Sequence, residues 1–130
     1  NNWKMEIPMS KRPSLDATTL AQFTGSERYY RHPLVEGIMF TEGVKYVTDA
    51  AGAYWLLDEI ALANRFERSV RAEEFQVWDL KVADDCSASL VCGDGDGAEV
   101  YSKSIEWTDF PFPGVRFYLC YGCIHLPSEY

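Results

Sequence analysis

The sequence lacks any long apolar run. Its longest one, from Ala50 to Leu57, is interrupted by Gly52 and is far shorter than the roughly 20 residues that a helix needs to cross a bilayer. The first residues, NNWKMEIPMSKRPS, also lack the continuous apolar stretch of a secretory signal. We therefore expect a protein that resides in the cytoplasm and contacts no membrane, with its four cysteines as reduced thiols.

Basic residues are scarce relative to acidic ones. The chain carries 12 Lys and Arg against 20 Asp and Glu, for a net charge of -8. Binding to nucleic acid depends on Lys and Arg replacing the cations condensed on phosphate, so this charge disfavours a nucleic-acid partner. The arginine-rich stretch NRFERSVR, residues 64–71, is diluted by Glu67 and its neighbouring acids, and we interpret it as a solvated charged turn.

Internal repeats and low-complexity tracts are absent too. A chain of 130 residues is long enough to bury one core without disulfides or metals, so one domain is expected. Pro8 and Pro13 interrupt the beginning of the chain. We predict an N-terminal arm over residues 1–13 and a single domain over residues 14–130.

The first part of the domain combines a helical pattern with a stretch of no pattern. Leu15, Leu20 and Phe23 give an apolar stripe that predicts a short helix over residues 14–23. The following GSERYYRHPL, residues 25–34, shows neither helical nor strand periodicity. We interpret that stretch as a loop.

Two further helices are predicted in the middle of the chain. Thr41 is a good N-cap for a helix over residues 42–51, whose apolar residues recur three and four apart. Residues 53–64 have the wide apolar face of a central helix packed on a sheet. Gly52, between the two, either ends the first helix or kinks it into the second.

The second half of the chain reads as strands joined by short turns. Short connections indicate an antiparallel meander, because parallel neighbours need a crossover of a dozen or more residues. We predict an α+β fold in which two or three N-terminal helices pack on an antiparallel sheet of four or five strands. In the first predicted strand, Phe75 and Val77 point to one face and Trp78 and Leu80 to the other, so both faces carry apolar residues. Either a bulge intervenes or both faces are partly covered. The strand candidates are EEFQVWDLKV, SASLVC, AEVYSKSIEW and VRFYLC.

The stretch FYLCYGCIHL, residues 117–126, is predicted to be a hairpin. A two-residue loop at Tyr121-Gly122 pairs Cys120 with Cys123 and sorts the flanking residues into one apolar and one polar face. Tyr is a poor first residue for such a turn, and a three-residue loop with a bulge would shift the register by one. The apolar pattern favours the two-residue loop.

These cysteines also raise the question of a metal or redox site. A redox pair would need a CxxC at the start of a helix, and too little chain follows for one. Cys120, Cys123 and His125 could supply three zinc ligands and Cys92 a fourth, but the usual spacing of ligand pairs is met only once. GDGDG, residues 93–97, lacks the ligand spacing of a calcium loop and reads as an Asp-Gly hairpin. We predict no metal and no cofactor.

Catalytic machinery is not evident. The two histidines, His32 and His125, are the available imidazole bases, and neither stands beside a nucleophile with an evident oxyanion site. We therefore predict no catalytic residues, and a non-catalytic role is favoured over an enzyme.

Aromatic residues are more abundant than a core of this size requires. Either some of them line a pocket or an interface, or they half-bury on the two faces of a sheet. The loop ERYYRHPL and the central helix together offer rings, a guanidinium, an imidazole and a carboxylate. The alternative is that Arg31 or His32 merely pairs with Asp58 or Glu59 and ties the loop down. The predicted ligand-binding residues are Tyr29, Tyr30, Arg31, His32, Tyr54 and Asp58.

Several stretches resemble an uncharacterised bacterial family, a domain of unknown function scattered through plasmids, phages and other mobile elements. They are LAQFTGSERYYRH, TEGVKYVTDAAGAYWLLDEIA, VRAEEFQVWDLKV and LPSEY. The resemblance implies a small cytoplasmic accessory protein of mobile DNA, such as an integron gene cassette, and supplies no catalytic residues.

We expect a homo-oligomeric accessory protein that binds another protein or a small molecule through exposed aromatics around residues 29–32. The alternative is a small-molecule-binding protein or an enzyme, with a pocket formed by that loop and the central helix.

Overall fold

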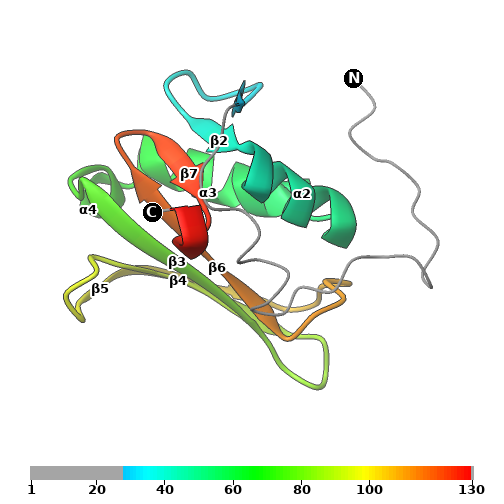
Figure 1. Ribbon diagram of the computed structural model, residues 1–130. Helices are drawn as coiled ribbons and strands as arrows, with labels where there is room; N and C mark the ends of the chain where they lie inside the picture. The colour runs from blue at the N-terminus through cyan, green and yellow to red at the C-terminus, as the bar shows by residue number, and fades with distance from the viewer. Residues whose placement is uncertain (1–27, 130) are drawn as a thin grey trace.

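The computed structural model describes residues 28–129 and contains one seven-stranded sheet with helices (Figure 1). The predicted arm over residues 1–13 and the predicted helix over residues 14–23 lie outside the described residues. The sheet order is β1-β2-β7-β6-β3-β4-β5. In chain order the elements are β1 (Tyr29–Arg31), β2 (Met39–Thr41), α2 (Glu42–Ala51), α3 (Tyr54–Phe66), α4 (Arg68–Arg71), β3 (Phe75–Val82), β4 (Ala88–Gly93), β5 (Glu99–Ile105), β6 (Gly114–Cys120), β7 (Cys123–His125) and η2 (Pro127–Glu129).

The two predicted central helices are present and are separated at Gly52. Thr41 caps α2 as predicted, because its hydroxyl accepts the backbone N–H of Val44 at 3.2 Å. Gly52 adopts φ 63°, a left-handed conformation that ends α2 rather than kinking it, and Ala53 then donates to the carbonyl of Thr48 at 2.9 Å. None of the helices within residues 28–129 has the length and apolar character that a membrane crossing requires.

The mixed fold of helices and sheet is confirmed, but the sheet is larger than predicted. The four predicted strands correspond to β3, β4, β5 and β6. The loop predicted over residues 25–34 is wrong at residues 29–31, which form β1 and pair with β2. Three-residue strands are too short to show alternation, which explains why the pattern missed them.

Two short helices also depart from the prediction. The charged turn predicted at residues 64–71 ends in α4, a short helix held down by the fully buried Val70. The η2 turn follows the last strand, so the helices are not all N-terminal.

The connectivity is not the simple meander that was predicted. β3, β4 and β5 do follow one another as antiparallel neighbours, but β6 returns to pair with β3 on the side away from β4. β7 then pairs in parallel with β2, with Met39 opposite Cys123. The first and last strands of the described chain therefore lie at one end of the sheet.

The sheet has two unlike faces. We call the face covered by α2 and α3 the helix face (Figure 1); its alternating positions on β3 include Trp78 and Leu80, both buried. The other face, which we call the open face, carries the half-buried Phe75, Val77 and Asp79 of the same strand. The pairing of β3 shows no bulge, so both faces are partly covered, which was one of the two predicted alternatives. The largest fully buried side chains are Trp78, Phe117, Leu56, Leu57, Ile60, Leu80, Leu90, Ile124 and Leu126.

The cysteine hairpin has the predicted register. Cys120 lies opposite Cys123 and Tyr118 opposite His125. Tyr121 (φ 52°) and Gly122 (φ 77°) are both left-handed, which is the turn type that matches the twist of a two-residue hairpin. A Cβ on Gly122 would lie 2.5 Å from the carbonyl oxygen of Gly37, so the turn presses against the β1–β2 loop.

The end of the described chain is clamped onto the start of α2. The Glu129 carboxylate accepts the Thr41 hydroxyl at 2.7 Å and the Leu126 N–H at 2.8 Å. A Cβ on Gly43 would lie 2.8 Å from that carboxylate, so a side chain at this position would displace the Glu129 carboxylate. Glu129 therefore links η2 to the start of α2, where a negative charge is favourable.

Candidate functional site

His32, one of the predicted site residues, is buried between the β1–β2 loop and α3. Its side chain is 1% exposed. Its Nδ1 accepts the backbone N–H groups of Leu34 and Val35, each at 3.1 Å. Because both partners are donors, the ring proton must sit on Nε2, which donates to Asp58 Oδ1 at 2.7 Å.

This arrangement engages both nitrogens of the His32 ring. A general base needs an accessible lone pair, and Nδ1 already uses its own for two backbone donors. The ring instead fixes the turn at residues 32–35 and ties it to α3 through Asp58. The sequence left two hypotheses for His32, a ligand-binding role and a pairing with Asp58 or Glu59 that ties the loop down. The structure contains the pairing with Asp58.

Tyr30 and Tyr54, two further predicted residues, are brought together through Phe40. Tyr30 stacks on Phe40 with ring centroids 5.6 Å apart, and Tyr54 contacts Phe40 edge-on with ring centroids 6.0 Å apart. These three rings come from β1, β2 and the first turn of α3. They form an aromatic row beside α2 in which Phe40 is buried and the two tyrosines are partly buried.

Charged groups from α2 border this row. Lys45 lies over the Tyr30 ring, 5.6 Å from its centroid, and is paired with Asp49 at 2.7 Å. Burial, followed by the neighbouring Asp49 carboxylate, raises the pKa of Tyr54 well above its ordinary value. The Tyr54 phenol therefore keeps its proton at neutral pH and cannot serve as a general base there.

A hollow of about 570 Å³ opens beside the β1–β2 loop and is lined by residues 31–39. Arg31 and His32 of the predicted set belong to its lining, and Tyr54 and Asp58 do not. Tyr29 is 54% exposed on the edge strand. The six predicted residues are thus divided between an edge strand, a hollow and an aromatic row rather than gathered in one pocket.

The cysteines occupy both faces of the sheet. Cys92 is buried on the helix face opposite Trp78, whereas Cys120 and Cys123 lie on the open face. Burial, with a smaller effect of Glu73, raises the pKa of Cys92 to about 12. Within the part of the chain that the structure describes, no group of three His, Cys, Asp or Glu side chains is arranged to hold a metal ion.

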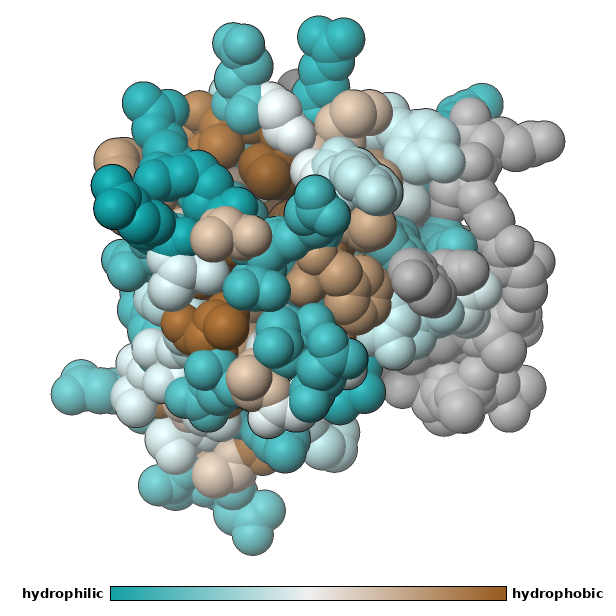
Figure 2. All heavy atoms as spheres, turned by 90° about the vertical axis from the view of Figure 1, so that its left-hand side faces the viewer, coloured by the Kyte–Doolittle hydropathy of each residue, from teal (hydrophilic) through white to brown (hydrophobic). Residues whose placement is uncertain are grey.

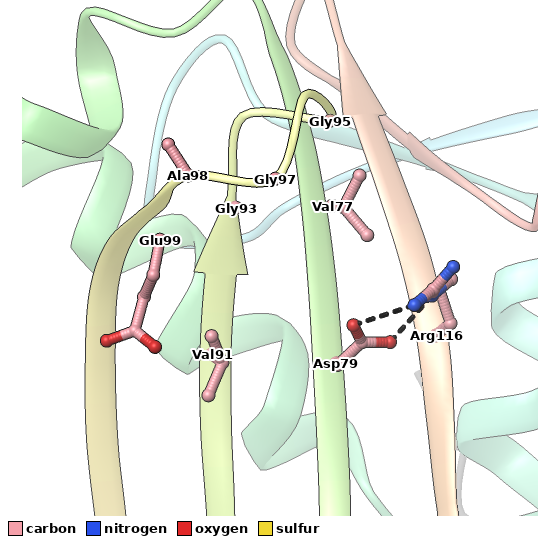
Figure 3. Close-up of a pocket in the computed structure, with 9 residues that line it drawn as sticks. All are labelled: Val77, Asp79, Val91, Gly93, Gly95, Gly97, Ala98, Glu99 and Arg116. Carbon is pink, nitrogen blue, oxygen red and sulfur yellow. Dashed lines mark hydrogen bonds and ion pairs between the residues drawn. The ribbon is translucent and has the colours of Figure 1, made fainter.

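A second pocket, of about 370 Å³, lies on the open face beneath the β4–β5 turn (Figure 3). Val77, Val91 and Ala98 contribute its apolar side chains. Arg116 stands at one side and donates to Asp79 through two bonds of 2.7 and 3.0 Å. The predicted Asp-Gly hairpin is confirmed here: Asp94 accepts from Asp96 and Ala98 inside the turn. Its glycines leave the pocket open.

Sequence reasoning did not find this open-face pocket. Arg116 and Asp79 are 37 positions apart and meet because β3 and β6 are neighbours in that register. The available signal was the second set of apolar residues on β3, Phe75 and Val77, which marked a face that is not simply solvated.

The chain was also compared with known proteins. A search of curated proteins and a search of solved structures each find no significant match. The model of a family of unknown function, DUF6876, matches residues 15–130. This span covers most of the chain, and the protein belongs to that family of unknown function.

Proposed function

We propose that this protein is a non-catalytic binding protein that works as a homo-oligomer and pairs with a second copy of itself along β1. The mobile-DNA origin implied by the resemblance, and with it an accessory role, belong to this proposal. The observation that carries it is β1, the edge strand of the sheet within residues 28–129, which presents an exposed tyrosine and an exposed arginine on one face.

The hydrogen-bond pattern of the β1–β2 ladder determines which backbone groups of β1 point away from the sheet. His32 N donates to Ile38 O at 2.8 Å, so His32 and Ile38 form a hydrogen-bonded pair. Such pairs alternate along an antiparallel ladder, which makes Tyr30 and Phe40 the next one. The backbone groups of Tyr29 and Arg31 therefore point to the outer edge of the sheet, where an added strand would bind them.

A second copy fits this edge in one antiparallel register. Pairing centred on Tyr30 sets Tyr29 opposite the partner's Arg31, and these are the residues whose backbone groups point outward. Each guanidinium would then lie beside a tyrosine ring across the two-fold axis, and the contact would occur twice. The edge is therefore complementary to itself.

One side of the molecule favours an edge contact over a broad apolar one. On the side of the molecule drawn in Figure 2, apolar residues form separate islands among hydrophilic ones. Large interfaces between subunits usually need a continuous apolar patch. Strand addition instead relies on backbone hydrogen bonds, which a short edge can supply.

The test is the mass of the protein in solution, measured by light scattering over a range of concentrations. Arg31→Pro removes one outward N–H and leaves the bonds to β2 in place, so it should shift the protein to a monomer. Arg31→Glu should weaken association as well. The double variant Tyr29→Lys with Arg31→Glu restores an opposite-charge pair and should restore the oligomer.

Tyr121→Ala is the matched control, because Tyr121 is 86% exposed and lies off the edge strand. It should leave the oligomer intact. A wild-type protein that is monomeric at every accessible concentration would refute the homo-oligomer. An Arg31→Pro variant with unchanged mass and unchanged circular dichroism would show that the oligomer does not use β1.

The hollow lined by residues 31–39 supports a second candidate function, the binding of a small molecule. Its volume of about 570 Å³ falls in the range of roughly 300–1,000 Å³ typical of ligand pockets. Native mass spectrometry of protein purified from cells would detect a retained molecule as extra mass per subunit. Loss of that mass in Arg31→Ala, but not in Arg116→Ala, would assign it to this hollow.

A further inference from the structure

The connection between β5 and β6 is hydrogen-bonded to the β3–β4 turn. Thr108 N donates to the carbonyl of Cys86 at 2.8 Å, and the Thr108 hydroxyl accepts the N–H of Phe110 at 3.1 Å. Thr108 and Phe110 are both buried. This segment therefore has a defined position, although it contains neither helix nor strand.

Trp107 stands next to these anchors and is 66% exposed. A large ring beside two buried residues is unusual in such a fixed segment, because the fold gains little from leaving it in water. Trp107 and Trp55, which lies in the first turn of α3, border one small hollow. The hollow measures about 190 Å³ and is lined by Trp55, Ile105, Trp107, Thr108 and Asp109.

The surroundings of this hollow are acidic. The β3–β4 turn contributes Asp84 and Asp85, and the segment after β5 contributes Glu106 and Asp109. Residues 83–87 and 106–113 contain no Lys, Arg or His. Hydrogen bonds from Ser87 hold the pKa of Asp85 below its ordinary value, so its charge persists into the acidic range.

Aromatic faces beside carboxylates suit one ligand chemistry. The face of an indole attracts a cation through its quadrupole, and a carboxylate at the rim adds to that attraction. The positive end of α3 near Trp55 acts against a cation, but the Asp109 carboxylate lines the hollow, and Asp84, Asp85 and Glu106 stand in the two segments that Thr108 and Cys86 join. An anion would meet those carboxylates, and a neutral apolar group would gain nothing from them.

The size of the hollow restricts the ligand further. Pockets for drug-sized molecules enclose roughly 300–1,000 Å³, and this one is smaller. It has room for the end of one side chain. We propose that Trp55, Trp107 and Asp109 form a recognition site for a lysine side chain of a basic segment in a partner protein.

This site is independent of the proposed β1 pairing, since it uses none of the residues of that edge. The test is titration of the full-length protein with the blocked tripeptide Gly-Lys-Gly, followed through the indole N–H signals in ¹H–¹⁵N spectra. The sequence has four tryptophans. Trp78 serves as an internal reference, because its indole N–H is held by Gln76 at 2.9 Å in the core.

The expected result is a saturable shift of the Trp55 and Trp107 signals with no shift of Trp78. Blocked Gly-Gln-Gly and Gly-Glu-Gly should produce neither shift. Trp107→Ala should weaken binding of Gly-Lys-Gly about tenfold. Asp109→Asn should weaken it about threefold, with the effect reduced by added salt.

Two matched variants control for a general effect of aromatic and acidic surface residues. Phe66→Ala removes a ring that is also exposed, at the far end of α3, and Asp96→Asn removes a charge in the β4–β5 turn. Neither should change the affinity. The proposal is overturned if Gly-Lys-Gly shifts neither signal, if Gly-Glu-Gly shifts them equally, or if Phe66→Ala weakens binding as much as Trp107→Ala.

Discussion

The two faces of the sheet differ in how far their polar groups are buried. On the helix face, the buried Gln76 amide accepts from the indole of Trp78 at 2.9 Å and exchanges hydrogen bonds with the half-buried Asn64 at 2.8 and 3.1 Å. On the open face, the principal polar contact is the pair between Asp79 and Arg116, which is partly in water. One face uses polar groups to fix a unique packing, and the other keeps them accessible.

This difference separates stability from recognition. Buried hydrogen-bond networks are costly to break because each orphaned group loses its solvation. An exposed ion pair contributes little, so its surroundings can change at low cost. The helix face and the contacts to α2 and α3 should therefore determine stability, whereas the open face should tolerate substitution.

The largest expected effect compares two neighbours on β3. Trp78→Ala should reduce the free energy of unfolding by about 3–5 kcal/mol, because it leaves a cavity and removes the hydrogen bond from the indole to Gln76. Val77→Ala, one residue away on the open face, should cost about 1 kcal/mol. Urea denaturation followed by circular dichroism measures both. Equal losses would mean that the two faces are not energetically distinct.

The His32 contact to α3 should give the next largest effect. His32→Leu leaves the N–H groups of Leu34 and Val35 without an acceptor and should cost about 2–3 kcal/mol. Asp58→Asn should cost less than about 1 kcal/mol, because the amide oxygen still accepts from Nε2. Thermal unfolding of the two variants gives the comparison. A more damaging Asp58→Asn would indicate that charge, rather than the fixed turn, matters at this site.

If Glu129 holds the start of α2, the effect of Gly43→Ala on stability should change sign when Glu129 is removed. Gly43→Ala should destabilise by about 1 kcal/mol, because the new methyl group displaces the carboxylate that binds Thr41. In a Glu129→Ala background the same change should stabilise by about 0.5–1 kcal/mol, the usual gain of alanine over glycine in a helix. Denaturant titration of the four proteins completes the cycle, and additive effects would contradict the clamp.

The ion pair of the open face should matter least for stability. The coupling energy between Asp79→Ala and Arg116→Ala should fall at about 0–1 kcal/mol and decrease in high salt. A double-mutant cycle measures it. A coupling well above this range would place the pair among the structural contacts of the molecule.

Thiol labelling distinguishes the faces without changing stability. Iodoacetamide should modify the exposed Cys86 quickly and leave Cys92 untouched until the protein unfolds. Burial, with Glu129 and Cys120 adding to it, raises the pKa of Cys123, so its thiolate fraction is small and its labelling should be slow at pH 7 and faster at higher pH. Peptide mass spectrometry reads all three, and fast labelling of Cys92 in the native state would contradict a closed helix face.

Local patterns were sufficient to predict several elements. The Thr41 cap and the cysteine hairpin depend on neighbours in sequence, and both were predicted with the correct register or role. The pairing of His32 with Asp58 was one of two alternatives, and geometry was needed to choose it.

What the sequence could not supply is long-range. β2 is part of the sheet because it pairs with β7, and β1 because it pairs with β2. The three residues of each strand do not by themselves indicate these pairings. The same holds for the open-face pocket, whose Arg116 and Asp79 come from separate strands. The hollow beside Trp107 depends on a connection that has no regular structure.

The position of β7 has a consequence for synthesis on the ribosome. β7 lies between β2 and β6, and Glu129 then fastens the start of α2. Residues 29–51 leave the exit tunnel long before residues 123–129 are made, so the first hairpin and its helix must wait for the last strand before they can join the sheet. A nascent chain stopped short of residue 123 would present two unpaired strand edges to its surroundings, which makes residues 123–129 decisive for the folding of this sheet.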